Sequence, residues 1–229
     1  MKKQEYDKKI ILYALIPGLG QFKNGQKEKG AIFLTIFGLF CLESAFFGIN
    51  ALQELITLGS EPGIDNSMFL MVRGTLQLLI TLIFVGFYVS QIRDAIKVNK
   101  NKTIGLPIAT GFTGIKGSLA THGFPYLLTF PAYILMIFTI VLPVLVTLFM
   151  AFTNYDFNHI PPAALIDWIG IQNFKDMFFL SSYRSTFMAV FSWTLIWTLI
   201  ASTLQIILGV FTATVAHQDW IKGKRIFGI

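Results

Sequence analysis

The chain has 229 residues, of which 54% are hydrophobic and 13% are charged, and its mean hydropathy is +0.65. Soluble domains carry roughly 25% charged residues, so this chain has too little charge to cover the surface of a soluble globule. An ordinary cytosolic enzyme and a disordered tail are therefore excluded, and a polytopic membrane protein fits the composition. The single cysteine, Cys41, excludes an internal disulfide.

The first apolar run, residues 10–19, is too short to cross a bilayer, which takes about 20 helical residues. Four lysines precede it, so a secretory signal peptide is one interpretation of this segment. That interpretation would carry three more lysines across the membrane just before a true span. We favour an interfacial or half-inserted hairpin within residues 1–30, in which the helix is broken by Pro17, Gly18, Gly20 and the Asn24-Gly25 turn.

Four longer apolar stretches follow, and each can span the hydrocarbon core as a helix: residues 31–50, 69–90, 126–152 and 187–216. In the third stretch, Pro143 is expected to interrupt the hydrogen-bond ladder and kink the helix. The predicted fold class is all-α, with four transmembrane helices plus the amino-terminal hairpin. The predicted organisation is an amino-terminal segment, a two-helix membrane hairpin, a cytoplasmic linker and the start of a transmembrane domain, at residues 1–30, 31–90, 91–125 and 126–229.

The 18 lysines and arginines alternate between the segments that lie outside the spans. Seven precede the first span, five lie between the second and third, and three follow the fourth. The first intervening loop has none, the loop of residues 153–186 has two, and the remaining one is Arg73, inside a span. The positive-inside rule therefore predicts a cell-membrane protein with both termini in the cytoplasm. The basic charge then reflects topology, and no nucleic-acid partner is expected.

Two ionisable residues lie well inside the predicted spans, where a charge is costly. At 1.5 Å per residue, Glu43 and Arg73 lie about 10 and 6 Å below the outer end of their spans. We expect them to form an intramembrane ion pair across the first two helices. An outward-reaching Arg73 and a proton or ion relay are the alternatives.

The sequence offers no arrangement typical of an enzyme. The spacing of Gly20 and Gly25 is that of a phosphate-binding loop, but Gln26-Lys27 follows where Lys-Ser or Lys-Thr is needed. The three histidines, His122, His159 and His217, are isolated from one another. We therefore expect no catalytic residue, no cofactor and no metal site, and any ATP would be hydrolysed by another chain.

A family resemblance begins near residue 124. It is carried by the end of the proline-bearing third span, by Pro161-Pro162, and by the segment of residues 168–174. The matching residues are Phe152, Thr153, Asn154, Tyr155, Asp156, Trp168, Gly170, Asn173 and Phe174. They resemble the larger, MalF-type membrane subunit of sugar ABC importers, and most of all the maltose and maltodextrin members from Gram-positive bacteria. The segment from Pro17 to Gly25 is similar to the extra amino-terminal segment of those members.

The resemblance implies a set of partner proteins, and it implies that family members have a further carboxyl-terminal part. The partners would be a second permease subunit of the MalG type, cytoplasmic ATPase subunits and an extracytoplasmic sugar-binding protein, all acting at the lipid bilayer. Family members continue past residue 229 through further spans and an ATPase-docking loop, so we expect the chain to be the amino-terminal part of such a permease. No sugar-contacting residue can be carried over onto it.

Two questions stay open at this point. A four-span scaffold or assembly protein without transport activity is the alternative to a permease, whereas a channel would need a polar stripe that no span shows. The aromatic residues of the loop 153–186, among them Trp168 and Phe174, are expected to form a docking surface for the binding protein. The alternative is an aromatic belt at the membrane interface.

Overall fold

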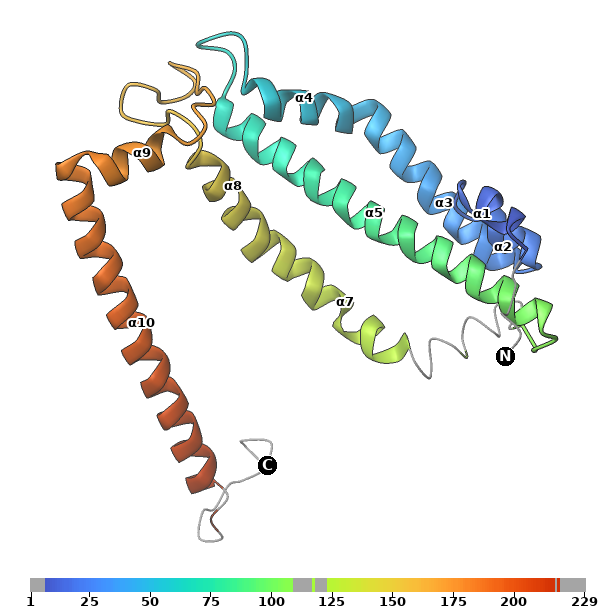
Figure 1. Cartoon of the computed structure of the whole chain (residues 1–229). Helices are drawn as coiled ribbons and strands as arrows, with labels where there is room; N and C mark the ends of the chain where they lie inside the picture. The colour runs from blue at the N-terminus through green and yellow to red at the C-terminus, as the bar shows by residue number, and fades with distance from the viewer. Residues whose placement is uncertain (1–6, 109–116, 118–122, 217, 219–229) are drawn as a thin grey trace. The chain divides into compact units, whose positions relative to one another are not determined.

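The computed structural model describes residues 7–108, 117, 123–216 and 218, and these residues are mainly helical (Figure 1). Among them no strand forms, and Thr153 and Trp168 make an isolated β-bridge. Four helices are long and apolar enough to cross a membrane: Lys27–Thr57, Ser67–Thr103, Phe124–Met150 and Ser181–Ala216. The predicted all-α class with four spans is therefore confirmed. The chain divides into two compact units, Met1–Ile169 and Gly170–Ile229.

The first unit begins with two short helices, α1 (Lys9–Ala14) and α2 (Leu19–Asn24). Gly18 separates them with a φ of 95°, and Gly25 ends α2 in the left-handed region. Glycine adopts these conformations without the steric cost of a side chain. Both helices pack against a longer neighbour, where Ile10 and Ala14 form a small buried cluster with Ala95. The expected hairpin is thus a docked pair of helical turns.

The first two spans lie side by side as an antiparallel pair (Figure 1). One is built from α3 (Lys27–Glu43), a π-helical turn η1 (Ser44–Gly48) and α4 (Ile49–Thr57). The other is α5 (Ser67–Thr103), whose first turn is capped by the Asn66 side chain, which accepts hydrogen bonds from the backbone N–H groups of Met68 and Phe69. Phenylalanines pack between α3 and α5, and the rings of Phe40 and Phe84 stack with centroids 3.7 Å apart.

Helix α5 runs well past the predicted end of its span at residue 90. Its 37 residues measure about 55 Å at 1.5 Å per residue, whereas the hydrocarbon core is about 30 Å thick. The end of α5 therefore extends beyond the apolar layer. The amino-terminal helices α1 and α2 dock against this extension.

The third span contains α7 (Phe124–Met136), a π-helical turn η3 (Ile137–Val141) and α8 (Leu142–Met150). The π-helical turn comes just before Pro143, where the missing N–H interrupts the hydrogen-bond ladder as predicted. Helix α8 packs against α5. Its Val146 joins Leu58, Met71 and Ile166 in a buried cluster that connects α8, the start of α5 and the loops beside them.

The second unit contains α9 (Gln172–Phe179) and the long helix α10 (Ser181–Ala216). Phe178 of α9 packs edge-to-face against Phe187 of α10, with ring centroids 6.0 Å apart. No residue of α10 is buried. A helix of this kind presents apolar side chains all round, as expected for one that meets lipid or other membrane helices.

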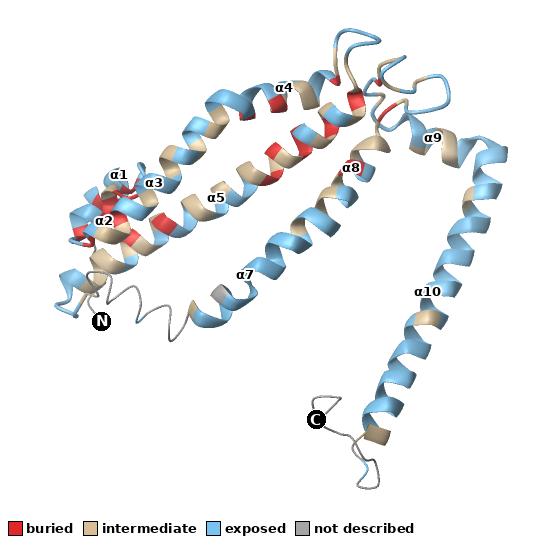
Figure 2. Cartoon of the chain, turned by 180° about the vertical axis from the view of Figure 1, so that it is seen from behind, coloured by how far each residue is buried: buried red, intermediate tan, exposed pale blue. Residues whose placement is uncertain are grey.

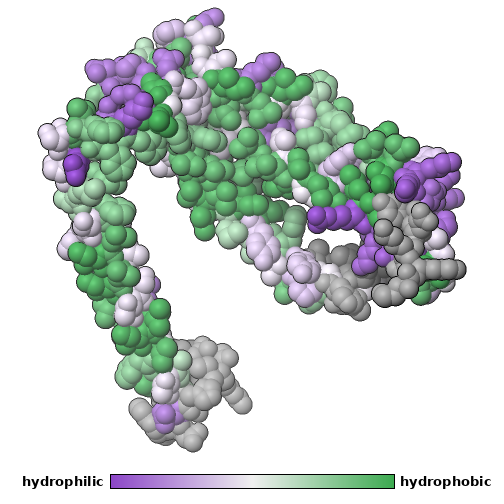
Figure 3. Space-filling model, in the orientation of Figure 1, coloured by the Kyte–Doolittle hydropathy of each residue, from purple (hydrophilic) through white to green (hydrophobic). Residues whose placement is uncertain are grey.

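The buried residues of the first unit lie in two separate regions and do not form one central core. Buried residues lie where α1 and α2 meet α5, and again along the half of α5 that faces α4 (Figure 2). In the view of Figure 3, hydrophobic side chains cover the middle of the α3–α5 pair, and hydrophilic residues gather toward its ends. This banding is typical of helices that cross a bilayer.

Candidate functional site

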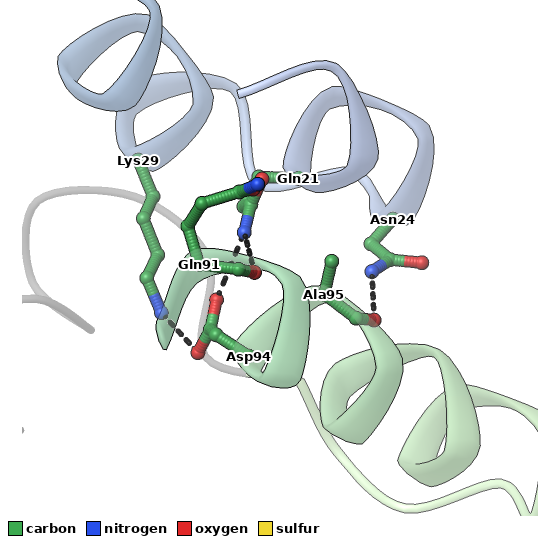
Figure 4. Close-up of polar contacts among 6 residues, drawn as sticks. All are labelled: Gln21, Asn24, Lys29, Gln91, Asp94 and Ala95. Atoms are coloured by element: carbon green, nitrogen blue, oxygen red, sulfur yellow. Dashed lines mark hydrogen bonds and ion pairs between the residues drawn. The ribbon is translucent and has the colours of Figure 1, made fainter. Parts of the chain in front are cut away.

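A polar cluster fixes the amino-terminal hairpin onto α5 (Figure 4). The buried Gln21 side chain donates through Nε2 to the Gln91 carbonyl at 3.0 Å and to the Asp94 carboxylate at 3.2 Å. Lys29 of α3 bonds the other oxygen of Asp94 at 2.6 Å. One carboxylate therefore ties α2 and α3 to α5. We call Gln21, Asn24, Lys29, Gln91 and Asp94 the polar lock.

Two further bonds complete the polar lock. Asn24 donates through Nδ2 to the Ala95 carbonyl at 2.8 Å. Gln91 donates through Nε2 to the carbonyl of Ala14 at 2.7 Å, which is the open carboxyl end of α1. Helix ends leave carbonyls without partners inside the helix, so Gln91 satisfies one that would otherwise be buried without a donor.

Glycines bring the backbones close enough for these bonds. A Cβ on Gly18 would lie 2.3 Å from the Gly30 carbonyl oxygen, and one on Gly30 would lie 2.9 Å from the Gly18 carbonyl oxygen. A Cβ on Gly20 would lie 2.9 Å from the Ala95 side chain. Small residues at such crossings allow membrane helices to pack closely. The segment from Pro17 to Gly25 thus has a specific structural purpose.

The structure corrects the expected ion pair between Glu43 and Arg73. Arg73 instead pairs with Glu54, with 3.1 Å between Nη1 and Oε1. Glu43 accepts a hydrogen bond from Gln77 Nε2 at 3.1 Å and lies within 3.5 Å of the Ser44 hydroxyl. The physical reason is the position of Glu54, which lies on α4 near the end of the first span. Its carboxylate is within reach of Arg73 and closer to the polar end of the helix pair than that of Glu43.

The Glu43–Gln77 contact lies directly before the π-helical turn of the first span. A Cβ on Gly48 would lie 2.5 Å from Gln77 Nε2, so a larger residue here would require the amide to shift. Interhelical hydrogen bonds of this type replace water as the partner of a polar group in the membrane. Glu43 and Gln77 therefore join the two helices near their middle.

Two loops close the opposite end of the first unit from the polar lock. We call residues 58–66 and 151–169 the loop cap. Gly63 donates its N–H to the Pro162 carbonyl at 2.7 Å, and Ile166 donates its N–H to the Ser67 hydroxyl at 3.1 Å. Trp168 donates through Nε1 to the Leu55 carbonyl at 3.2 Å and packs edge-to-face on Phe149. The loop cap thus binds the third span to the first two.

Several residues of the family-type motif build this loop cap. The Asn154 N–H donates to the Asp167 carbonyl at 3.1 Å, while its side chain accepts the Asp167 N–H at 2.7 Å. The Ile169 N–H donates to the Phe152 carbonyl at 2.9 Å, and the buried Thr153 hydroxyl bonds the Met150 carbonyl at 2.8 Å. Their contacts are structural.

Other motif residues lie apart from these contacts. Tyr155 is exposed in the loop cap. Gly170, Asn173 and Phe174 belong to the second unit, where Gly170 has a φ of 63° and the other two lie in α9.

Two carboxylates in the loop cap have lowered pKa values. The pKa of Asp65 lies below its ordinary value because the backbone N–H groups of Ser60 and Glu61 donate to the carboxylate, at 2.7 and 3.0 Å. The pKa of Asp156 is also lowered, mainly by the hydrogen bond from the His159 ring. Both carboxylates organise local turns.

Acidic, histidine and cysteine side chains do not gather in threes anywhere in the part of the chain that the structure describes. His159 binds Asp156, whereas His122 and His217 lie outside the described residues. The polar contacts given above join helices and loops to one another. The sequence did not identify the polar lock or the partnership of Glu54 with Arg73. Two features of the sequence could have indicated them. Gln21 and Asn24 are three residues apart and so share one face of a short helix, and Glu54 lies near the end of its span.

These features define a multi-pass membrane protein whose helices are joined by buried polar contacts. The chain is 55% identical over 96% of its length to the maltodextrin transport system permease protein MdxF of Bacillus subtilis strain 168. It is 48% identical over its full length to the maltodextrin permease protein MalC of Streptococcus pneumoniae, and 39% identical over 95% of its length to the galactooligosaccharides permease protein GanP of Bacillus subtilis.

The chain spans about half the length of the curated relatives it matches, at 51–52% of each. No family model and no solved structure matches it. The resemblance to maltodextrin permeases that the sequence predicted is confirmed.

Proposed function

We propose that the chain forms part of the membrane permease of a maltodextrin ABC importer and lines or supports its translocation pathway. The observation that carries the proposal is the 55% and 48% identity to two maltodextrin permeases across nearly the whole chain. The lower identity of 39% to a galactooligosaccharide permease favours maltodextrins as the substrate class. Four helices of membrane-spanning length fit a permease subunit.

The proposed partners are a second permease subunit of the MalG type, ATPase subunits that hydrolyse ATP on the cytoplasmic side, and an extracytoplasmic sugar-binding protein. Exposed apolar helices support a larger assembly. None of the residues of α10 is buried, and Trp193 and Trp197 are each more than 60% exposed. Such an extensive apolar surface is expected where a helix contacts both lipid and neighbouring membrane helices.

The proposed orientation places both termini and the polar lock on the cytoplasmic side. Support comes from the charges at the two ends of the first unit. The loop cap has no lysine or arginine, whereas nine lysines and arginines lie among residues 7–30 and 91–103 at the other end. Positive residues are concentrated in cytoplasmic segments of membrane proteins.

The loop cap is the proposed docking surface for the binding protein. The residues proposed to make the contact differ from the Trp168 and Phe174 that the sequence suggested. Trp168 is held by Phe149 and Leu55, so its main contribution is to the shape of the loop cap. The apolar side chains it leaves outward are Phe157, which is 96% exposed, Ile64, Ile160 and Tyr155. Exposed apolar groups of this kind are typical of protein contacts.

Exchange of this chain into a complete relative tests the proposal. The matching half of MdxF would be replaced by the present sequence in a Bacillus subtilis strain that lacks its own maltodextrin permease. We expect the chimera to support growth on maltodextrins as carbon source. A strain with the matching half of GanP in the same place provides the control for sugar class. Normal membrane abundance without growth would contradict the proposal and favour a scaffold protein.

A further inference from the structure

One face of the amino-terminal hairpin carries exposed apolar side chains. Ile10 and Ala14 point into the small cluster with Ala95 and are buried. The residues between and after them are exposed apolar side chains, with Leu12 69% and Leu15 53% exposed. The set on this face is Ile11, Leu12, Tyr13, Leu15 and Ile16. We call it the hairpin face.

Basic residues are concentrated at the end of the first unit that holds the hairpin face. Lys23 lies with its ammonium 5.2 Å from the centre of the Tyr13 ring, at the edge of the face. Among the described residues of this end, Lys29 is the lysine that forms an ion pair, with Asp94 in the polar lock. The other basic side chains near this end are exposed and form no ion pair with any acid among the described residues: Lys8, Lys9, Lys23, Lys27, Arg93, Lys97 and Lys102.

Acidic residues are few at this end. Between residues 7 and 30 and between 91 and 103, the acids are Asp7, Glu28 and Asp94, against nine lysines and arginines. Asp94 is neutralised by Lys29, and Asp7 accepts the Lys9 backbone N–H at 3.0 Å. A strong positive excess therefore remains beside an exposed apolar face.

We propose that the hairpin face binds anionic phospholipids at the membrane surface. Short apolar side chains next to lysines match a bilayer boundary, where acyl chains lie beside charged headgroups. Lys9 and Lys23 would meet the headgroup phosphates, while Leu12, Leu15 and Ile16 enter the acyl region. Basic clusters beside membrane helices favour anionic over neutral lipid. The polar lock makes this surface rigid, because α1 and α2 are already fixed on α5.

Charge decides between lipid and protein as the occupant. A neutral apolar partner would cover the hairpin face but leave Lys9, Lys23 and their neighbours beside a low-dielectric contact without counter-charges. Anionic phospholipids supply apolar chains and negative charge in one molecule. They therefore complement both properties of the surface.

Lipid-specific quenching tests the proposal on the whole membrane-inserted protein. Cys41 would be replaced by serine and Leu12 by cysteine, and the new cysteine labelled with an environment-sensitive fluorophore. The protein is reconstituted into bilayers of neutral phospholipid that contain brominated phosphatidylglycerol or, in parallel, brominated phosphatidylcholine. We expect phosphatidylglycerol to quench the label more strongly at equal content.

The matched variants separate charge recognition from mere immersion in lipid. Lys9→Gln/Lys23→Gln removes two charges from the hairpin face and should lower the apparent affinity for phosphatidylglycerol about tenfold. Lys175→Gln/Arg184→Gln removes two exposed charges from the second unit and should leave it unchanged. Equal quenching by the two lipids would overturn the proposal, as would a label that neither lipid reaches, since that result means protein covers the face.

Discussion

At the scale of single residues, polar side chains decide how the helices of the first unit are joined. Gln21 and Asp94 connect three helices through one carboxylate, and Gln77 connects Glu43 to the neighbouring span. Each is a polar group with a defined partner in an apolar setting, where a lost partner costs about 1–3 kcal/mol. Such contacts specify which helix faces meet. Apolar side chains alone specify this poorly, because they pack against lipid as well as against another helix.

The pairing of Arg73 gives a test of the corrected ion pair. Arg73→Ala and Glu54→Ala should be coupled, so that the double variant loses less stability than the sum of the single variants, by about 0.5 kcal/mol for such an exposed pair. The measurement is the unfolding midpoint of each variant in detergent. Arg73→Ala combined with Glu43→Ala serves as the control and should be additive. Coupling in the control and none with Glu54 would restore the original expectation.

The lowered pKa of Asp65 predicts a local response to acid. The folded carboxylate is favoured by the N–H groups of Ser60 and Glu61, so its contribution to the loop is present at neutral pH. That contribution is lost as the pH falls through the lowered pKa. Hydrogen exchange of residues 58–66 should therefore speed up at acid pH, beyond the change in intrinsic rate.

Asp65→Asn provides the control for this response. The amide keeps an oxygen that can accept a hydrogen bond but does not titrate. We expect the variant to show faster exchange at neutral pH and a flat dependence on acid. An unchanged acid response in Asp65→Asn would show that the Asp65 carboxylate is not its source.

At the scale of helices, glycine marks where two elements meet and where a helix faces lipid. Gly30 and Gly38 lie in the same helix, but only a Cβ on Gly30 meets another part of the described chain, the Gly18 carbonyl at 2.9 Å and the Phe22 ring at 2.9 Å. The two positions have the same intrinsic preference for alanine. They therefore separate packing from helix propensity.

Alanine at these two positions should have opposite effects. Gly30→Ala forces the hairpin away from α3 and should lower stability by about 1–3 kcal/mol. Gly38→Ala should be neutral or stabilise by up to about 1 kcal/mol. Thermal stability of the two variants in detergent, with protease accessibility of residues 7–26, gives the measurement. Equal effects would show that the close approach of Gly18 and Gly30 contributes nothing to docking.

Prediction from sequence succeeded for elements whose signal is local. Apolar length gave four spans, and Pro143 gave the interruption of the third helix. The partner of Arg73 depended on the relative shift of two helices, which spacing along one helix does not determine. The roles of Gln21 and Asn24 were hidden for the same reason, since their partners Gln91, Asp94 and Ala95 are about 70 residues away.

At the scale of the whole molecule, the first unit has two polar ends of opposite character. The end with the polar lock has nine lysines and arginines among residues 7–30 and 91–103, whereas the loop cap has acids but no lysine or arginine. This asymmetry predicts the orientation in the membrane. Single cysteines at Asn158 in the loop cap and at Thr103 at the end of α5 would be compared after Cys41→Ser. An impermeant thiol reagent should label whole cells at position 158 and leave position 103 unlabelled; the reverse pattern would invert the proposed topology.

Transport in a defined membrane tests the central claim most directly. The chimeric permease that carries this chain would be purified with its second permease and ATPase subunits, and reconstituted into vesicles with the sugar-binding protein. We expect labelled maltodextrin to accumulate in an ATP-dependent manner, and an excess of unlabelled maltodextrin to compete better than galactooligosaccharide. An assembled complex that hydrolyses ATP without moving maltodextrin, while the parent complex transports it, would contradict the account.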